Sequence, residues 1–500
     1  MSERSSGILL PVYSLPSPHG VGTMGRAAME FIDFLAAAGQ RWWQLLPLGP
    51  TGYGDSPYQS FSTFAGNPYF IDLDLLADDG LLTAAEIAAA DAPGDDARVD
   101  YGALYRTRPA LLRSAAERLL AREPDCAERF AAEQPWVRDW ALFSALKAHF
   151  NGAAWTDWPE DIRLRQPEAL ARWRGLLAHE SALETAVQLL FDRQWSALRA
   201  YAAGKGVKIL GDLPFYVAPD SADVWAEPRF FALDAKGRST AVAGVPPDYF
   251  SADGQLWGNP LYDWAAMTAD GCGWWIRRIA GAQRRYDAVR IDHFRGFARY
   301  WAVPAGAGSA REGVWLPGPG MALLGVLNDW FPELTFIAED LGVLTPEVHA
   351  LRRECGWPGM RVLQFAFDPD GDGAYLPHNC ERECLCCTGT HDNTTLAAWT
   401  AEASDRERAF AQRYLGVAAG RLREAVLRAG LGSVAEYFFA QMQDYLALGA
   451  AARTNTPGTA QGNWQWRLRP GQLTAALAAE IAGLTALYGR GKPAEQEEAE

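Results

Sequence analysis

Continuous apolar runs that end in small or polar residues recur along the chain and indicate buried strands. A strand with one solvated face alternates apolar and polar residues, whereas parallel strands covered on both faces are apolar almost throughout. Runs of the second kind occur at residues 7–13, 42–48, 207–215, 288–294, 334–341, 360–367, 384–392 and, less regularly, 447–459. The pattern predicts eight parallel strands.

Segments with apolar residues at helical spacing lie between these runs. Residues 25–39 show this spacing and end at a glycine, which is a common helix stop. Residues 194–206, 404–416 and 433–448 behave in the same way. Because strands and helices alternate, we expect an α/β fold, a (β/α)₈ TIM barrel formed as one domain over residues 1–500.

Two intervals are too long to be simple strand-to-helix connections. Residues 71–190 are rich in Ala, Leu, Arg and Glu with helical periodicity, which predicts an inserted, mainly helical subdomain. Residues 216–275 are rich in Pro, Gly, Asp and Trp, which predicts a loop-rich insertion, and residues 304–320 form a shorter Gly/Pro insertion. Long loops of a barrel carry function when they lie at the carboxyl ends of its strands.

Composition and charge narrow the class of protein. Hydrophobic residues make up 49% and charged residues 21%, as in ordinary folded proteins. The net charge is −15, which argues against nucleic acid or an anionic membrane as partner, since both require a basic surface. Twenty tryptophans fit either a large core or a cleft in which aromatic rings stack on sugars.

The chain shows no signal peptide and no apolar run long enough to span a membrane, so we expect a cytoplasmic protein. Four of the seven cysteines crowd into the segment from Cys380 to Cys387, with Cys384 and Cys386 between them. Their spacing matches no metal-binding pair, and Cys386 and Cys387 would point to opposite faces of a strand. We expect buried thiols in a reducing compartment and no metal site.

Charged side chains stand where the predicted strands end. In residues 288–294, side chains alternate, so Arg290 and Asp292 share one face while Val289 and Ile291 share the other. The apolar pair can pack against helices, and the charged pair then points into the barrel. An adjacent arginine keeps a buried carboxylate ionised and fixes its direction.

Other strand ends supply further polar groups. Glu339 follows an apolar strand, which favours a raised pKa and general-acid chemistry. Asp212, His391 and Asp392 end two more strands. Two carboxyl groups about 5–5.5 Å apart serve retaining glycosidases, one as nucleophile and one as acid/base, and a third can hold the sugar.

Structural interpretations stand beside each of these assignments. An aspartate at a strand end can be a helix cap, an Arg/Asp pair can be a salt bridge, and His391 can be a core histidine. Asp340 is interpreted as structural because it faces away from Glu339. The joint occurrence of the groups in barrel order favours the catalytic interpretation.

The motifs that carry these residues resemble those of the amylomaltases, the 4-alpha-glucanotransferases of the alpha-amylase clan. "VRIDHFRG", "IAEDLG", "GTHDN" and "GDLPFYV" resemble the segments of the nucleophile, the acid/base, the third carboxylate and the first clan motif. Motifs specific to amylomaltases are found at residues 52–73, 244–264 and 454–467. The resemblance covers nearly the whole chain and implies that no separate C-terminal β-domain is present.

The resemblance implies a role for individual residues. Asp292 would be the nucleophile, Glu339 the acid/base and Asp392 the transition-state stabiliser. Arg290 and His391 would orient the nucleophile and the donor sugar, Tyr58 would stack at the donor site, Trp257 would stack on acceptor glucose units, and Asn463 would also bind substrate. Asp212, in the first clan segment, is a further substrate-binding candidate. The residues leave open whether His293 or Arg295 contacts the sugar, and His293, at the end of the strand, is the preferred candidate. The loop at residues 244–255 would cap the cleft. Relatives often carry another acidic residue after "HDN", where this chain has "HDNTT", which puts only local loop contacts in question.

The expected function is transfer of alpha-1,4-glucan segments between maltooligosaccharides through a covalent intermediate on Asp292. A hydrolytic alpha-amylase-like enzyme and an inactive glucan-binding protein are the alternatives. We expect no cofactor and no metal, no nucleic-acid or membrane partner, and a monomer or weak homodimer.

Overall fold

The computed structural model describes residues 4–52, 54–90, 95–247, 253–342 and 344–491. At its centre eight parallel strands form one sheet in the order β10-β11-β12-β1-β2-β3-β6-β9. Their bounds are β1 Ser5–Leu9, β2 Trp42–Gln44, β3 Lys208–Leu213, β6 Ala288–Ile291, β9 Thr335–Ala338, β10 Gly359–Val362, β11 Cys384–Cys387 and β12 Tyr437–Gln441. The sheet curls into the predicted (β/α)₈ TIM barrel.

The first and last strands of the barrel are neighbours. Ser5 pairs with Tyr437, and the register continues to Leu9 beside Gln441. Arg490 is fully buried behind this pair, where its guanidinium donates to the carbonyl oxygens of Ser5 and Ser433 at 3.0 and 2.9 Å. The two ends of the described chain therefore hold one seam of the barrel.

A second seam lies between β9 and β10, where a side chain replaces part of the backbone ladder. Ala338 N donates to Pro358 O at 2.8 Å, and Met360 N donates to Asp340 Oδ1 at 2.6 Å. Asp340 also pairs with Arg352 at 3.1 Å. A Cβ atom at Gly359 would lie 2.5 Å from the Asp340 carboxylate, so this approach requires glycine. Asp340 closes the barrel.

The barrel strands bury side chains on both faces. The interior holds Trp42, Leu210, Ala288, Ile337, Met360, Val362, Leu385, Cys387 and Phe439. Val289, Ile291 and Cys386 belong instead to the larger cluster between strands and helices. Neighbouring residues therefore point to opposite sides of the barrel wall, as predicted for Cys386 and Cys387 and for the apolar face of β6.

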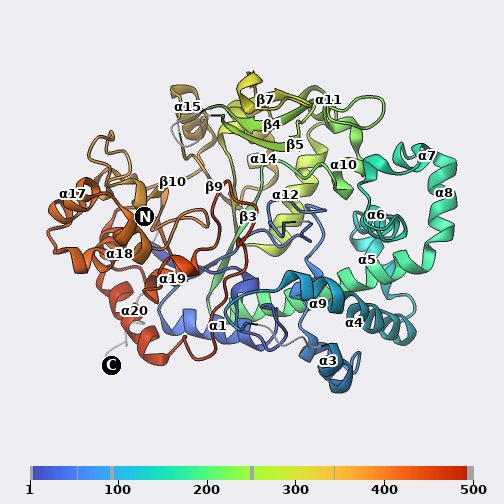
Figure 1. The fold of residues 1–500 in the computed structure, drawn as a ribbon, viewed down its shortest axis with the longest axis horizontal. Coiled ribbons are helices and arrows are strands. Elements are labelled where there is room, and N and C mark those ends of the chain that lie inside the picture. Colours follow the sequence, from blue (N-terminus) through green and yellow to red (C-terminus); the bar gives the residue numbers. More distant parts are fainter. Residues whose placement is uncertain (1–3, 53, 91–94, 248–252, 343, 492–500) are drawn as a thin grey trace, which may run out of the picture.

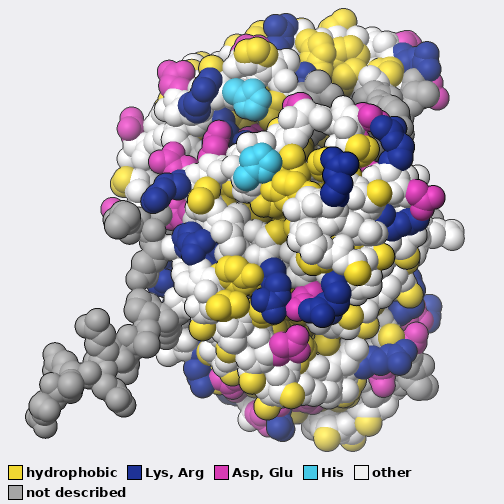
Figure 2. Space-filling model, turned by 90° about the vertical axis from the view of Figure 1, so that its left-hand side faces the viewer, with side chains coloured by type: hydrophobic (Ala, Val, Ile, Leu, Met, Phe, Trp, Pro, Cys, Tyr) yellow, Lys and Arg dark blue, Asp and Glu magenta, His cyan; other side chains and the backbone are white. Residues whose placement is uncertain are grey.

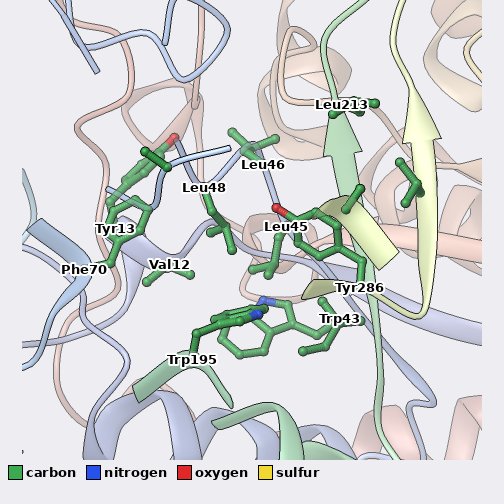
Figure 3. Close-up of a cluster of buried hydrophobic side chains, with 14 of the residues drawn as sticks. Val12, Tyr13, Trp43, Leu45, Leu46, Leu48, Phe70, Trp195, Leu213 and Tyr286 are labelled. Carbon is green, nitrogen blue, oxygen red and sulfur yellow. The ribbon is translucent and has the colours of Figure 1, made fainter. Parts of the chain in front are cut away.

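The outer layer of the core is rich in aromatic rings (Figure 3). Trp43 on β2 has no exposed surface, and its indole nitrogen donates to Leu10 O at 2.8 Å. Trp195 lies edge-on to Tyr286 with ring centroids 6.4 Å apart. The Tyr286 ring occupies the space that a Cβ atom at Gly211 of β3 would need. Much of the tryptophan content thus serves the core.

Helices surround the barrel and fill the first long insertion, on the right of Figure 1. The helices are α1 Arg26–Ala37, α2 Leu73–Asp78, α3 Ala84–Ala90, α4 Tyr101–Arg122, α5 Cys126–Glu133, α6 Val137–His149, α7 Glu160–Arg163, α8 Pro167–Leu176, α9 Ala178–Gly204, α10 Ala222–Ala226, α11 Trp264–Ala269, α12 Gly273–Arg285, α13 Arg295–Ala298, α14 Met321–Trp330, α15 Pro346–Cys355, α16 Leu396–Glu402, α17 Asp405–Leu415, α18 Leu422–Gly432, α19 Met442–Tyr445 and α20 Ala475–Leu487.

A second sheet, which the sequence pattern did not predict, lies at the top of Figure 1. Its four antiparallel strands run in the order β5-β4-β7-β8, with bounds β4 Ala241–Val245, β5 Gln255–Pro260, β7 Arg299–Pro304 and β8 Val314–Pro317. The Gly- and Pro-rich segments that indicated loops therefore contain short strands. Beyond β12, the described residues add no further sheet to the fold.

The eighth strand was predicted in the wrong place. Residues 447–459 form a short 3-10 turn and loop, while β12 lies at Tyr437–Gln441, inside the predicted helix 433–448. Phe438 and Phe439 are buried on opposite sides of the barrel wall. Aromatic residues favour strands, and this local preference is realised where both faces are covered.

The seven cysteines are free and buried. In the described part of the chain, no group of His, Cys, Asp and Glu side chains has the geometry of a metal site. Every described helix is too short or too polar to cross a lipid bilayer. Figure 2 shows basic side chains interspersed with acidic ones over one face of the molecule.

Candidate active site

Arg290 of β6 holds two carboxylates at once. Its Nη1 donates to both oxygens of Asp212, at 2.7 and 2.9 Å, and its Nη2 lies 2.9 Å from Asp292 Oδ1. Asp212 belongs to β3, which pairs with β6 so that Asp212 and Arg290 are in register. The arginine and Asp212 are buried, while 30% of the Asp292 side chain is exposed. Asp292 is therefore the member of this trio that substrate can reach.

Burial and charge oppose each other in this trio. Burial alone would lower the pKa of Arg290. The negative charges of Asp212 and Asp292 raise it by more than burial lowers it, so the pKa stands well above its ordinary value. Burial raises the pKa of Asp212, and the positive charge of Arg290 offsets part of that rise. A permanently charged arginine thus sits against the two carboxylates.

Glu339 follows β9 and reaches the segment after Asp292. The amide of His293 donates to Glu339 Oε2 at 2.8 Å, and the amide of Leu341 donates to Oε1 at 3.1 Å. Burial raises the pKa of Glu339 to about 8, with Arg290 opposing and Asp292 reinforcing the shift. A carboxyl group in this state is protonated at neutral pH and can donate a proton.

Tyr58 joins the trio to the segment after β11. Its hydroxyl donates to Asp212 Oδ2 at 2.6 Å and lies 3.0 Å from His391 Nδ1. The two rings are stacked, with centroids 4.7 Å apart and planes 23° from parallel. Trp464 lies within 6 Å of both rings, at 5.9 and 5.7 Å between centroids. Tyr58 therefore contacts His391 with its ring and Asp212 with its hydroxyl.

Asp392 lies at the far end of this chain of contacts. Its Oδ1 is 3.3 Å from His391 Nε2 and accepts a 2.6 Å hydrogen bond from Asn455 Nδ2. The side chain is 46% exposed. Arg453 donates to the backbone oxygen of Asp392 at 2.5 Å. The third carboxylate is thus open to solvent on one side and tied to a neighbouring loop on the other.

An aromatic group lies beside His293. The Trp257 ring, on β5, is edge-on to the His293 ring at 4.9 Å, and Tyr216 lies 6.3 Å from both rings. Burial lowers the pKa of His293 to about 4, so its imidazole is neutral at pH 7. Of the predicted capping loop 244–255, residues 248–252 lie outside the described residues.

Asn463 differs from the other predicted site residues. Its side chain accepts from Thr456 N at 2.9 Å and donates to Thr459 O at 2.9 Å, both within its own loop. The structure gives it no contact with the carboxylates. Asn455 and Trp464 contact the site, and neither was predicted, although both stand in the motif at residues 454–467.

Proteins of similar sequence are 4-alpha-glucanotransferases. The sequence model of the 4-alpha-glucanotransferase family matches residues 10–474. A 4-alpha-glucanotransferase of Thermus thermophilus is 48% identical over 495 residues, covering 96% of this chain and 98% of the relative. One from Streptococcus pneumoniae is 45% identical over 495 residues and covers 98% of each chain.

Solved structures of amylomaltases share the fold. The structure of an amylomaltase from Streptococcus agalactiae in complex with acarbose superposes with a TM-score of 0.95 at 39% identity, over 98% of this chain and 100% of that one. The amylomaltase of Corynebacterium glutamicum, at 19% identity and a TM-score of 0.77, shares the fold. The chain belongs to the 4-alpha-glucanotransferase family and is an enzyme of that activity.

Proposed function

We propose that this enzyme transfers alpha-1,4-glucan segments between maltooligosaccharides by a retaining double displacement, with a covalent glycosyl-enzyme at Asp292. One observation carries the proposal: Arg290 holds the partly exposed Asp292 at the edge of a buried charge cluster, and the amide of the next residue binds a glutamate whose pKa is about 8. A fixed carboxylate and a protonated acid are the two groups that such a reaction requires.

In the first step, the Asp292 carboxylate attacks the anomeric carbon, the glycosidic C–O bond breaks, and Glu339 gives its proton to the departing oxygen. In the second step, Glu339 takes the proton of an acceptor hydroxyl, the new C–O bond forms, and Asp292 leaves. Asp392 stabilises the sugar as positive charge develops on its ring. Asp212, Arg290 and His391 orient the carboxylates and the donor sugar.

Transfer instead of hydrolysis requires that an acceptor sugar binds well and that water is poorly placed. Trp257 and His293 support this assignment, because an indole beside a neutral imidazole offers an apolar platform next to Glu339. Tyr58 provides the platform on the donor side. Asn463 holds the loop next to Asp392 through Thr456 and Thr459, and it contacts the bound sugar from there.

The cellular setting follows from the same features. Seven free, buried thiols suit a reducing compartment, so we infer a cytoplasmic enzyme. Its glucans are of the starch or glycogen type, because these polymers contain the alpha-1,4 links on which 4-alpha-glucanotransferases act. We infer a monomer or weak homodimer. The excess of acidic residues, 61 against 46 basic ones, suits neutral sugars better than polyanions.

Incubation with maltotriose tests the reaction class. Transfer gives free glucose together with maltooligosaccharides longer than maltotriose. Maltose and glucose without any longer product would make the enzyme a hydrolase, and no product at all would make it a binding protein.

Trapping tests the covalent step. Glu339→Gln incubated with alpha-maltosyl fluoride, whose leaving group needs no acid, should accumulate a glycosylated peptide that contains Asp292, detectable by mass spectrometry. Asp292→Asn should show no adduct and no transfer, while Asp370→Asn, which alters an exposed ion pair with Arg406, should keep full activity. An adduct on another residue would refute Asp292 as nucleophile.

A further inference from the structure

The loop that contains Arg453 and Asn455 is fastened to the segment that carries Asp392. Asn455 N donates to His391 O at 3.1 Å, and Arg453 Nη2 donates to Asp392 O at 2.5 Å. Arg453 Nε also donates to Asn455 O at 2.7 Å. One arginine therefore links both segments through backbone oxygens, and the relative position of the two loops does not depend on the Asn455 side chain.

The Asn455 side chain adds one contact of a different kind. Its amide nitrogen lies 2.6 Å from Asp392 Oδ1, the same oxygen that lies 3.3 Å from His391 Nε2. Within the described residues, Asp392 Oδ2 has no hydrogen bond to protein. A hydrogen bond to an ionised oxygen is shorter and stronger than one between neutral groups, so Asn455 fixes both the position and the rotation of the carboxylate.

We propose that Asn455 is a positioning residue for the glucan-transfer reaction, which holds Asp392 by Oδ1 so that Oδ2 remains to accept hydrogen bonds from the hydroxyls of the bound sugar. The inference rests on the proposed role of Asp392. A carboxylate fixed in advance stabilises a transition state without reorganising during the reaction, whereas a freely rotating one must be ordered first. The exposed position of Asp392 makes such a restraint necessary.

The other residues of the loop hold Asn455 in place. Thr454 is buried, and its hydroxyl accepts from Gln443 Nε2 at 3.2 Å, directly after β12. Trp464 N donates to Thr454 O at 2.8 Å. These contacts involve neighbours of Asn455 and not its own side chain. Substitution of Asn455 alone should therefore leave the loop folded.

The first test is the kinetics of Asn455→Ala with maltotriose. Loss of a hydrogen bond to a charged group should lower kcat about 10- to 100-fold, with a smaller change in KM. Asn379→Ala is the matched control, because Asn379 also uses its amide in one hydrogen bond, to Gly373 O, but on an exposed turn. A kcat within twofold of the wild type would overturn the inference.

The second test separates positioning from a merely structural role. Asn455→Asp places a second carboxyl group beside Asp392, where the two negative charges repel each other at neutral pH. On acidification, the introduced group takes up a proton and can donate the lost hydrogen bond. The activity of this variant relative to wild type should rise as the pH falls from 7 to 5. A ratio that does not change with pH would refute the proposal.

The third test asks whether Asn455 acts through Asp392. Affinity for acarbose, the ligand of the Streptococcus agalactiae structure, is measured for Asn455→Ala, Asp392→Ala and the double variant. We expect Asn455→Ala to weaken binding about tenfold in the wild type and not at all when Asp392 is absent. Equal effects in both backgrounds would overturn the inference. If Asp392→Asn alone keeps wild-type kcat, the proposed role of Asp392 fails instead.

Discussion

The amide nitrogen of His293 donates a 2.8 Å hydrogen bond to Oε2 of Glu339, so the residue that follows Asp292 holds the second carboxyl group of the site. His293 adopts a left-handed backbone conformation, with φ of 51°, which is uncommon for a residue other than glycine. The backbone conformation at the end of β6 thus fixes the position of the Glu339 carboxyl group relative to that of Asp292.

The pH dependence of the reaction should report Glu339. Because burial raises its pKa to about 8, Glu339 stays protonated through neutral pH and loses its proton above that value. We expect kcat/KM for maltotriose to fall tenfold per pH unit above about pH 8. Glu339→Gln should abolish turnover of maltotriose while turnover of alpha-maltosyl fluoride in the first step survives. A wild-type profile that is flat from pH 7 to 10 would exclude Glu339 as the acid.

The raised pKa of Glu339 should also make the protein less stable as the pH rises. The pKa of Glu339 is 4.5 in the unfolded chain and about 8 in the folded protein. The free energy of unfolding therefore falls as the pH rises from 4.5 to about 8, because the unfolded state releases the proton more readily. Glu339→Gln removes this effect. We expect its Tm to exceed that of the wild type at pH 8.5 and to match it near pH 4.5, measured by calorimetry. A Tm difference that does not depend on pH would contradict the raised pKa.

Arg290→Lys should damage the site although it keeps the charge. A lysine cannot donate two hydrogen bonds to Asp212 and a third to Asp292 in the fixed planar geometry of a guanidinium. We expect kcat/KM to fall about 100- to 1000-fold, which corresponds to roughly 3–4 kcal/mol. Arg277→Lys serves as the control, because Arg277 makes an exposed ion pair with Glu227. Similar losses in both variants would indicate a general effect on the fold.

Tyr58→Phe isolates the hydroxyl of Tyr58 from its ring. The ring can still stack on His391, while the 2.6 Å hydrogen bond to Asp212 is lost. We expect kcat to fall about 10- to 100-fold, because a buried carboxylate loses a charged-group hydrogen bond. Tyr201→Phe, which removes a hydroxyl bonded to the exposed Asp33, should leave kcat unchanged. A Tyr58→Phe enzyme as active as wild type would show that the ring alone matters.

Trp257→Ala tests the acceptor platform. Stacking of an aromatic ring on a sugar contributes binding only when an acceptor is present, so the KM for acceptor should rise about tenfold. The share of hydrolysis among the products should rise as well, because water then competes with a weaker acceptor. Trp330→Ala, at a tryptophan 63% exposed on α14, is the control. An unchanged product ratio would place the acceptor elsewhere.

The sequence predicted those features in which local pattern and tertiary environment agree. Seven barrel strands were located because both of their faces are buried, and Arg290 and Asp292 were placed on one face by alternation. β12 was missed because Tyr437–Gln441 lies among apolar residues at helical spacing. It forms a strand because the barrel interior covers one of its faces and the helices cover the other. The second sheet was missed because its strands are short, and each either contains a glycine or ends in a proline.

No pattern in the sequence predicts contacts between loops that are far apart along the chain. Asn455 meets Asp392 across 63 residues of chain, and no periodicity relates two loop positions. The role of Asp340 was half predicted: its direction away from Glu339 follows from alternation, but its hydrogen bond to Met360 depends on how the barrel closes. Such contacts are set by the packing of whole strands.

The pairing of β1 with β12 has a consequence for how the protein is made. During synthesis β1 can pair with β2 early, but its other edge stays unpaired until residues 437–441 and then Arg490 have been made. Until then the nascent chain carries an open sheet edge, which attracts other chains. The barrel therefore closes only after β12 and Arg490 have emerged, and the delay makes β1 a segment for chaperones to shield.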